Sequence, residues 1–317
     1  MNSAQKKELA RLCPSVQWQV DMARFSSLRT GGTVEALVEV DDCGSLPGLL
    51  GWLAQEEITW QVLGGGSNIL FTSGLHQGLF IRLRGGLDDI VLSQASGTDG
   101  EAGEQSVEVQ AGVSMSLLVA WCLRQGLSGL EFMAGIPGTV GGAVAMNAGA
   151  YGGSMGDRLA AVQLLDWQGN AMEVPASALR FQYRKTTLPP ECCREKCLIT
   201  GASLHLKPAP AARIKEAMHE VFAQRKAKHP AGVASAGSFF KNPPGDYAGR
   251  LIEEAGLKGY RHGQAMVSAM HGNFIINRGG ARPEDILSLM RFVQKRIYER
   301  HGIMLEPEVR FFECTEE

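Results

Sequence analysis

Residues 129–152 read GLEFMAGIPGTVGGAVAMNAGAYG, a glycine-rich stretch on which the interpretation of the whole chain depends. Two smaller glycine clusters precede it, RTGG at residues 29–32 and GGGSN at residues 64–68. Glycine makes up 39 of the 317 residues, well above its usual share of about 7%. Because glycine has no Cβ, it lets backbone N–H groups approach an anion closely. We therefore expect these loops to hold a phosphate or pyrophosphate through main-chain N–H groups.

The two standard nucleotide-binding motifs are missing from the sequence. It contains no G-x-x-x-x-G-K-[ST], and no G-x-G-x-x-G stands between a strand and a helix. Residues 152–156 spell G-x-S-x-G, but residues 147–151 before them do not read as the strand that a hydrolase nucleophile requires. The glycine loops therefore do not indicate a P-loop enzyme, a Rossmann dehydrogenase or a serine hydrolase.

Composition narrows the class of protein further. Lys and Arg number 31 against 33 Asp and Glu, so no bulk charge drives the chain toward nucleic acid or an anionic membrane. No stretch approaches the roughly 20 apolar residues of a membrane helix, and the N-terminus has no signal-peptide pattern. The seven cysteines include a cluster at Cys192, Cys193 and Cys197, but no pair of CxxC motifs. We expect a cytoplasmic protein with reduced cysteines, no metal site, and neither a membrane nor a nucleic acid as partner.

The coarse pattern is mixed α and β. Apolar residues at helical spacing predict helices that contain 117–122, 214–222 and 286–297, each with one core face. The β-rich runs predict strands at 36–40, 61–63, 79–83, 107–110, 162–167, 198–206, 274–277 and 309–312. The prolines at 208–210 separate a glycine-rich half from a smaller α+β half, and the last strand could pair with either.

Four motifs together resemble one enzyme family, that of UDP-N-acetylenolpyruvoylglucosamine reductase. Residues 129–152 resemble its flavin-binding signature, and VLGGGSNIL at 62–70 resembles its second flavin loop. AGSFFKNP at 236–243 resembles its proton-donor motif, and LEPEV at 305–309 its C-terminal glutamate motif. The resemblance extends from Phe25 to Phe312 and indicates the compact form of the family, because no inserted tyrosine loop is found between 241 and 276.

The resemblance implies an α+β fold with an FAD-binding part of the vanillyl-alcohol-oxidase type. Two α+β lobes would clasp the FAD, and a C-terminal α+β domain would present the substrate. The expected domains are 1–70 for the first lobe, to which 309–317 could return, 71–208 for the second lobe, and 209–308 for the substrate domain.

The resemblance also implies a two-step reaction. NADPH reduces FAD and leaves, and the enolpyruvyl ether of UDP-N-acetylglucosamine is then reduced to UDP-N-acetylmuramate for peptidoglycan synthesis. The FAD would be non-covalent, because neither the 29–32 loop nor the 64–68 loop contains a histidine. No obligate protein partner is implied. A flavin oxidase of the same fold and a non-catalytic nucleotide-sugar binder are the alternatives.

Three residues are expected to be catalytic. By resemblance, Ser238 protonates carbon, with Lys226, Lys228 or Lys241 as a positive neighbour. Arg184 would grip the substrate carboxylate with its planar fork, and Thr186 or Thr187 stands where the family often has serine. Glu308 enters an apolar strand, where a desolvated carboxyl could stay protonated and donate a hydrogen bond. Glu306, two residues earlier, is the alternative glutamate.

The remaining site residues follow from the same motifs. The residues expected to bind the substrate are Tyr183, Lys226, Lys241, Asn242 and His271. The residues expected to bind the flavin are Arg29, Thr30, Gly31, Gly64, Gly65, Gly66, Ser67, Asn68, Gly135, Pro137, Gly138, Thr139, Gly141, Gly142, Asn147 and Gly149.

Overall fold

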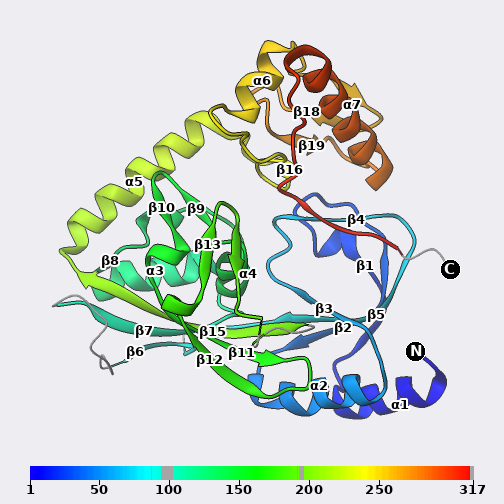
Figure 1. The fold of residues 1–317 in the computed structure, drawn as a ribbon, viewed down its shortest axis with the longest axis vertical. Helices are drawn as coiled ribbons and strands as arrows, with labels where there is room; N and C mark the ends of the chain where they lie inside the picture. Colours follow the sequence, from blue (N-terminus) through cyan, green and yellow to red (C-terminus); the bar gives the residue numbers. More distant parts are fainter. Residues whose placement is uncertain (87, 94–102, 191, 193–195, 315–317) are drawn as a thin grey trace. The chain divides into compact units, whose positions relative to one another are not determined.

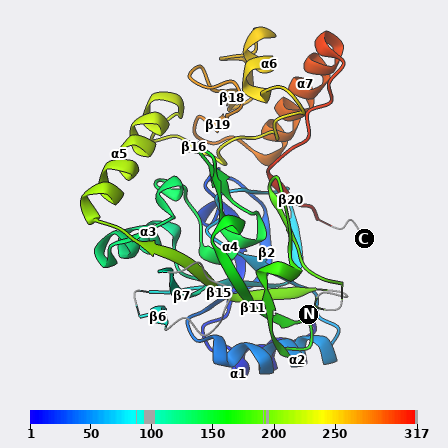
Figure 2. The same ribbon diagram turned by 60° about the vertical axis from the view of Figure 1, so that its left-hand side comes forward.

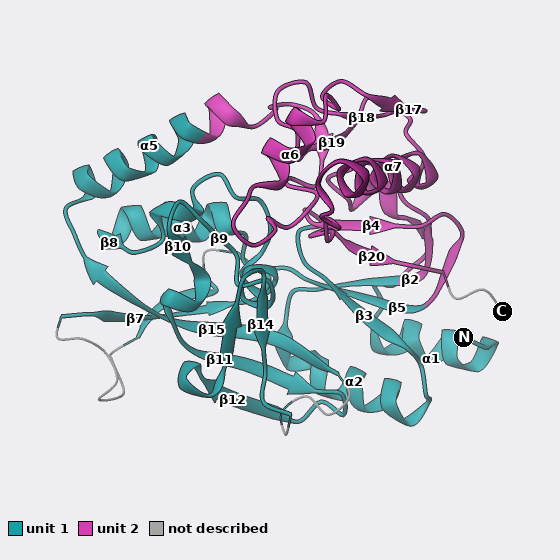
Figure 3. Cartoon of the chain, turned by 45° about the horizontal axis from the view of Figure 1, so that its top comes forward, with its two compact units in different colours: residues 1–16, 37–65, 78–224 teal, residues 17–36, 66–77, 225–317 magenta. Residues whose placement is uncertain are grey.

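The computed structural model describes residues 1–86, 88–93, 103–190, 192 and 196–314. Helices and strands are mixed along this part of the chain (Figures 1 and 2). The chain divides into two compact units (Figure 3). Unit 1 consists of residues 1–16, 37–65 and 78–224, and unit 2 of residues 17–36, 66–77 and 225–317. The chain passes from one unit to the other five times, after residues 16, 36, 65, 77 and 224. Three of these boundaries fall within β2 (Thr33–Val40), β5 (Leu75–Leu83) and α5 (Ala211–Lys228).

The centre of unit 1 is an antiparallel sheet whose strands run in the order β12-β11-β15-β7-β6. The long strand β15 also pairs with β8 at its far end. These strands are β6 (Ile90–Ser93), β7 (Gln105–Gln110), β8 (Leu127–Ser128), β11 (Leu159–Asp166), β12 (Ala171–Pro175) and β15 (Cys197–Pro208).

Helices α3 (Met115–Gln125) and α4 (Val140–Ala145) lie on one face of this sheet and belong to its core (Figure 2). The two N-terminal helices of unit 1, α1 (Ser3–Leu12) and α2 (Leu46–Gln55), lie beside each other, and Gln5 of α1 donates to the carbonyl oxygen of Glu56 just after α2. Gly126 has a φ of 68° and ends α3, a conformation that glycine adopts without the strain of a Cβ. The buried core of unit 1 includes Val107, Leu118, Val144, Val162 and Leu204.

Smaller elements complete unit 1. β3 (Trp60–Leu63) pairs in parallel with residues 79–82 of β5. Two short hairpins follow the glycine-rich stretch: β9 (Gly149–Ala150) with β10 (Gly153–Ser154), and β13 (Arg180–Gln182) with β14 (Lys185–Thr187).

Unit 2 has its own sheet and core. Its four strands run antiparallel in the order β16-β19-β18-β17. The buried face of α7 packs with Phe239 and Phe240 in one apolar core. The elements are β1 (Gln17–Asp21), β4 (Ile69–Phe71), β16 (Ala234–Ser235), α6 (Ala248–Glu254), β17 (Arg261–His262), β18 (Ala265–Val267), β19 (Ile275–Asn277), α7 (Pro283–His301) and β20 (Arg310–Phe312).

The last strand of the described chain lies beside a much earlier one. β20 pairs in parallel with β4, and the rings of Phe71 and Phe312 stack with their centroids 4.5 Å apart. Unit 2 is therefore assembled from three separate segments of sequence.

The predicted strands and helices are confirmed, with one correction. Each of the eight β-rich runs lies in or overlaps a strand, and the three predicted helices are α3, α5 and α7. The stripe on α5 is not a full core face, because Phe222 is 46% exposed while Ile214 and Val221 are buried. Within the described residues, no helix is both long and apolar enough to span a membrane.

Candidate functional site

The glycine loops of unit 1 pack directly against each other. A Cβ added to Gly65 would lie 2.7 Å from the Cα of Gly138, and one added to Gly64 would lie 2.9 Å from the Oγ1 of Thr139. Any side chain at Gly65 would push the two backbones apart. Some of the glycines in these loops are therefore required because the two loops pack closely against each other.

The same two loops carry main-chain donors that could hold an anion. Within the described residues, no acceptor is found for the N–H groups of Gly64, Gly65 and Gly138. By contrast, Gly141 donates to Ala111, and Thr139 caps α4 by accepting from Gly142. Backbone N–H groups on adjacent glycine loops suit a pyrophosphate, so these loops fit the FAD expected from the sequence.

Arg184 lies in a tight turn of unit 1. Gln182 of β13 pairs with Lys185 of β14, so Tyr183 and Arg184 are the two turn residues. Arg184 has a φ of 60°, an unfavourable conformation for a residue with a Cβ. Its guanidinium donates to the carbonyl oxygen of Gly149 at 2.8 Å and lies 5.0 Å from the ring centroid of the exposed Tyr183.

Asn147 braces this turn. It is buried, and its Nδ2 donates to the carbonyl oxygen of Gln182 at 3.2 Å while its Oδ1 accepts from the N–H of Gly156 at 2.8 Å. Asn147 and Gly149 were expected to bind the flavin. In the structure the side chain of Asn147 contacts Gln182 and Gly156, and the carbonyl oxygen of Gly149 accepts from Arg184.

Ser238 lies in a bulge at the edge of the unit 2 sheet. Ser235 pairs with Ile276, and the N–H of Phe239 donates to the carbonyl oxygen of Asn273 at 2.8 Å. Between these contacts the Ser238 side has one more residue than the facing segment. Bulges of this kind redirect a side chain and are frequent beside active sites.

Glu308 lies on the segment next to Ser238. The N–H of Glu308 donates to the carbonyl oxygen of Phe239 at 2.9 Å, and Phe240 forms a β-bridge with Pro307. The carboxyl oxygen Oε2 of Glu308 is buried. Glu306, the alternative, has a side chain that is 70% exposed and forms an ion pair with Lys241. The geometry therefore favours Glu308 as the glutamate beside Ser238.

Asn68 also contacts the Glu308 segment. Its Nδ2 donates to the carbonyl oxygen of Glu308 at 3.1 Å, and its own carbonyl oxygen accepts from the N–H of Arg310 at 3.0 Å. The second flavin loop is thus joined to the glutamate motif within unit 2.

The Arg29 loop is held in the same unit. Arg29 has a φ of 51°, Thr30 is buried, and Asn277 donates to the carbonyl oxygen of Leu28 at 2.9 Å. A Cβ added to Gly66 would lie 1.8 Å from the carbonyl oxygen of Phe25, so only glycine leaves room for the Phe25 main chain at this position.

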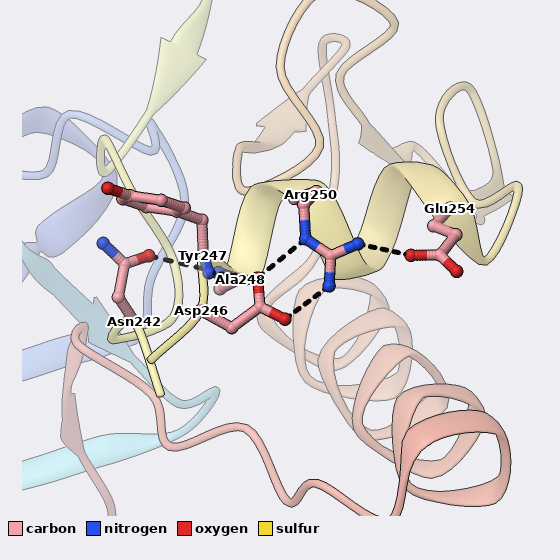
Figure 4. Close-up of polar contacts among 6 residues, drawn as sticks. All are labelled: Asn242, Asp246, Tyr247, Ala248, Arg250 and Glu254. Atoms are coloured by element: carbon pink, nitrogen blue, oxygen red, sulfur yellow. Dashed lines mark hydrogen bonds and ion pairs between the residues drawn. The ribbon is translucent and has the colours of Figure 1, made fainter. Parts of the chain in front are cut away.

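The residues expected to bind substrate have varied surroundings. Lys226 is exposed on the last part of α5, and Lys241 pairs with Glu306. Asn242 accepts from the N–H of Ala248 at 3.1 Å and so supports the start of α6 (Figure 4). His271 packs against Phe274, and its Nδ1 accepts from the N–H of Asn273 at 3.1 Å.

A charged network lies on α6 beside Asn242. Arg250 donates to Asp246 at 2.7 Å and to Glu254 at 2.6 Å (Figure 4). The hydrogen bonds from Arg250 lower the pKa of Asp246 to about 2. All three residues are on the surface, so this network orders one side of α6 and has no direct link to Ser238.

The structure brings together some of the predicted residues and leaves others in separate units. Ser238, Glu308, Asn68 and the Arg29 loop belong to unit 2, whereas Arg184 and the 64–65 and 138–142 loops belong to unit 1. Of the clustered cysteines, Cys193 lies outside the described residues, and the six described cysteines form no disulfide. The described residues contain no group of three or more side chains arranged to hold a metal ion.

Sequence reasoning missed two buried asparagines, Asn273 and Asn277. Each donates its side-chain amide to a loop of the candidate site, Asn273 to Phe240 and Asn277 to Leu28. The available signal was their position in the run NFIIN at 273–277, because a buried polar side chain in an apolar strand needs a hydrogen-bond partner.

Comparisons with known proteins match both parts of the chain. A family model described as an FAD binding domain matches residues 34–174. One described as the C-terminal domain of UDP-N-acetylenolpyruvoylglucosamine reductase matches residues 229–312. The curated reductase of Alkalilimnicola ehrlichii is 42% identical over 289 residues, 91% of either chain. That of Syntrophus aciditrophicus is 38% identical over 305 residues, 96% of this chain and 94% of the other.

A solved structure shares the fold. The crystal structure of the reductase from Thermus caldophilus has a TM-score of 0.75 and 39% identity, covering 92% of this chain and 97% of that one. The expected α+β fold, an FAD-binding fold of the vanillyl-alcohol-oxidase type with a C-terminal α+β domain, is thereby confirmed. The chain belongs to the UDP-N-acetylenolpyruvoylglucosamine reductase family.

Proposed function

We propose that Ser238, Arg184 and Glu308 carry out the substrate half of the reaction in this chain. The chain is an FAD-dependent oxidoreductase that converts UDP-N-acetylglucosamine enolpyruvate to UDP-N-acetylmuramate, a peptidoglycan precursor, with NADPH as reductant. Bound FAD supplies the hydride for the vinyl group of the substrate. The protein supplies binding, orientation and the proton.

The loops of unit 1 hold the FAD without a covalent bond. The N–H groups of Gly64, Gly65 and Gly138 bind its pyrophosphate, since they have no acceptor within the described residues. Ser67, Asn68 and the Arg29 loop are the further residues proposed to contact the FAD. Gly141, Gly142 and Asn147 support these contacts indirectly, because their polar groups hold neighbouring backbone.

Ser238 donates the proton. Hydride addition to the terminal vinyl carbon leaves negative charge on the adjacent carbon, and the hydroxyl of Ser238 protonates that carbon. The resulting alkoxide then takes a proton from solvent. Because Ser238 lies in a bulge between anchored segments, its hydroxyl is presented in a defined position.

Arg184 and Glu308 stabilise the charge that develops on the substrate. The fork of Arg184 binds the carboxylate with two parallel hydrogen bonds. Glu308, held next to Phe239, donates a hydrogen bond from its protonated carboxyl group. Lys226 and Lys241 are candidates to bind the diphosphate of the substrate, and His271 and Tyr183 are the other residues proposed to contact the substrate.

One observation carries the proposal: the hydrogen bond from the N–H of Glu308 to the carbonyl oxygen of Phe239, the residue after Ser238. Two motifs about 70 residues apart in sequence are thereby placed on neighbouring main-chain segments, as joint action on one substrate requires. If the two loops had unrelated roles, there would be no reason for them to pair in this way.

Anaerobic half-reactions test the proposal. The purified protein should be yellow, should release FAD on acid precipitation, and should be bleached by NADPH. Adding the enolpyruvyl substrate should restore the colour without oxygen. An oxidase of the same fold would need oxygen for that step, and a non-catalytic binder would not be bleached at all.

The domain division and location complete the proposal. We divide the chain into FAD lobes at 1–70 and 71–208 and a substrate domain at 209–308, with the last strand returning beside β4. The enzyme is a compact-form member that acts in the cytoplasm without an obligate protein partner.

A further inference from the structure

We propose that Asn273 is a positioning residue that fixes Ser238 for proton transfer by clamping the main chain of the two residues that follow it. This inference rests on the proposed role of Ser238 as proton donor. Asn273 itself does not touch the substrate; it acts through Phe239 and Phe240.

Asn273 makes three hydrogen bonds to these two residues. Its Oδ1 accepts from the N–H of Phe240 at 2.9 Å, and its Nδ2 donates to the carbonyl oxygen of Phe240 at 2.8 Å. Its main-chain carbonyl oxygen accepts from the N–H of Phe239 at 2.8 Å. The side-chain amide thus pairs with Phe240 as a strand would, in a place where the sheet has no strand.

The opposite edge of the same segment is held by the glutamate motif. The carbonyl oxygen of Phe239 accepts from Glu308, and the N–H of Lys241 donates to Glu306 at 2.8 Å. Together with Asn273, these contacts use every main-chain N–H and carbonyl group of Phe239 and Phe240. Both phenylalanine side chains are almost completely buried, with exposures of 0% and 1%. The segment after Ser238 is therefore rigid.

Before Ser238, the main chain is anchored at Ser235, which pairs with Ile276, but Gly237 next to Ser238 has open space around it. Gly237 has a φ of 77°, and a Cβ added there would meet nothing within 4 Å. Ser238 therefore has a glycine in open space on one side and, on the other, a residue whose main chain is fully hydrogen-bonded. Its position is set from the Phe239 side, and the only side-chain amide in that clamp within the described residues is that of Asn273.

Asn273 is in turn oriented by His271. The N–H of Asn273 donates to Nδ1 of His271, which requires that this nitrogen carry no proton. Burial lowers the pKa of His271, which keeps the ring neutral near pH 7. The chain of contacts runs from His271 through Asn273 to the Phe239–Phe240 segment.

Asn277, at the end of β19, offers a matched control four residues after Asn273. It is also buried, and it also donates its amide to a loop, but to Leu28 and Arg29 at 2.9 and 3.3 Å. An identical substitution at Asn277 therefore perturbs the Arg29 loop and leaves the Phe239–Phe240 clamp unchanged.

The experiment uses Asn273→Asp in the FAD-loaded enzyme. An ionised carboxylate still accepts from Phe240 but cannot donate to its carbonyl oxygen, whereas a protonated carboxyl can do both. Anaerobic reoxidation by the enolpyruvyl substrate should be slowed about 10²-fold at pH 8. A misplacement of the Ser238 hydroxyl by about 1 Å has an effect of this size on the rate. The rate should recover as the pH falls and the buried carboxyl takes a proton. The rate of reduction by NADPH should stay within about threefold of wild type, because the Asn273 contacts are proposed to matter only for reduction of the enolpyruvyl substrate.

Hydrogen exchange gives a second readout that does not depend on activity. The amides of Phe239 and Phe240 should exchange faster in Asn273→Asp than in wild type, and only above the pH at which activity is lost. Asn277→Asp, which does not contact Phe239 or Phe240, should leave the exchange of these two amides unchanged at every pH. Asn273→Gln, which keeps the amide but displaces it, should slow reoxidation at every pH.

Three results would overturn the proposal: wild-type reoxidation by Asn273→Asp at pH 8, equal damage to both half-reactions, or loss of folding in both Asn273 variants. Ser238→Ala in the same assay separates the two levels of the argument. If Ser238→Ala reoxidises normally, the role of Ser238 is wrong. If Ser238→Ala is slow and Asn273→Asp is normal, only the positioning role is wrong.

Discussion

The Arg184 turn of unit 1 and the Ser238 bulge of unit 2 hold a reactive side chain in opposite ways. In the turn, Arg184 itself adopts the unfavourable φ of 60°. In the bulge, the neighbour Gly237 adopts the positive φ, and Ser238 is spared the strain. A non-glycine residue at positive φ costs about 1 kcal/mol. The arginine thus bears the backbone strain itself, in a turn held by the hydrogen bond from Asn147 to Gln182, whereas beside the serine the positive φ falls on a glycine.

The largest expected effect tests the bulge. Ser238→Ala should lower single-turnover reoxidation by the enolpyruvyl substrate about 10²-fold or more, the usual contribution of a general acid. Binding of FAD and reduction by NADPH should be nearly unchanged. Ser238→Cys should recover part of the rate, since a thiol can donate from nearly the same place. A normal rate in the alanine variant contradicts the assignment and would direct attention to a water held by Glu308.

The next effect tests the turn. Arg184→Lys keeps the charge but loses the planar fork, so the substrate half-reaction should slow about tenfold. Reduction of the flavin by NADPH should change much less. Stopped-flow measurement of both half-reactions decides the matter, because equal damage to both would mean that Arg184 is structural or binds the pyridine nucleotide.

Glycine substitutions sharpen the contrast between close packing and open space. Gly65→Ala should destabilise the protein by about 2 kcal/mol and weaken FAD retention, because its Cβ would meet the Gly138 backbone at 2.7 Å. Gly237→Ala meets no atom and should cost only the conformational term, about 1 kcal/mol. Gly48→Ala, in open space on α2, is the control and should stabilise the protein by about 0.5–1 kcal/mol, because alanine favours a helix over glycine. Urea unfolding of the three variants gives the ranking, and equal losses at Gly65 and Gly48 would contradict the packing argument.

The smallest effect concerns acid. His229 and His271 pack with ring centroids 5.8 Å apart, and burial lowers the pKa of His229 to about 4 and also lowers that of His271. The unfolded chain therefore binds these protons first as the pH falls below about 6.5. The stabilisation is fully present above that pH and is lost as the pH falls toward 4, by about 1 kcal/mol after solvent screening.

The same acid effect distinguishes the two regions. The pKa values of the two histidines also depend on nearby charged groups: Arg225 and Lys228 on α5, Glu253 on α6 and Lys258 just after it. His229→Phe should flatten the pH dependence of stability between pH 6.5 and 4, and the same change at the exposed His262 should not. Hydrogen exchange should show loosening of the Ser238 segment in acid, while the Arg184 turn is unaffected. An unchanged slope in His229→Phe would contradict this origin.

Much of the fold could be predicted because its signals are local. The period of apolar residues in α3 and α7 and the β-rich runs of β7, β11 and β15 are properties of short windows. Several missed elements are short or polar: α1 has little apolar surface, and β9, β10 and β16 have two residues each. The apolar helix α2 was also missed, and its sequence contains Gly48 and Gly51, which weaken a helical pattern. The exposure of Phe222 depends on what surrounds α5, which no window contains.

The candidate site was less accessible from sequence, because its support comes from distant residues. The motifs gave Ser238 and Glu308, but only the fold shows Glu306 in an exposed pair with Lys241. The packing of Gly65 against Gly138 and of Gly66 against Phe25 joins loops far apart in sequence. Asn273 and Asn277 belong to no motif, and their importance depends on the backbone groups that they reach.

The pairing of β20 with β4 has a consequence for the synthesis of the protein. β4 leaves the ribosome early, but its partner at residues 310–312 and the neighbouring Glu308 leave it more than 230 residues later. Contacts between such distant segments form slowly, because a long loop must close before they contribute. A nascent chain that has already made Ser238 still has no Glu308 beside it. With Glu308 in its proposed role, a translation product that stops before residue 308 cannot stabilise the reduced substrate.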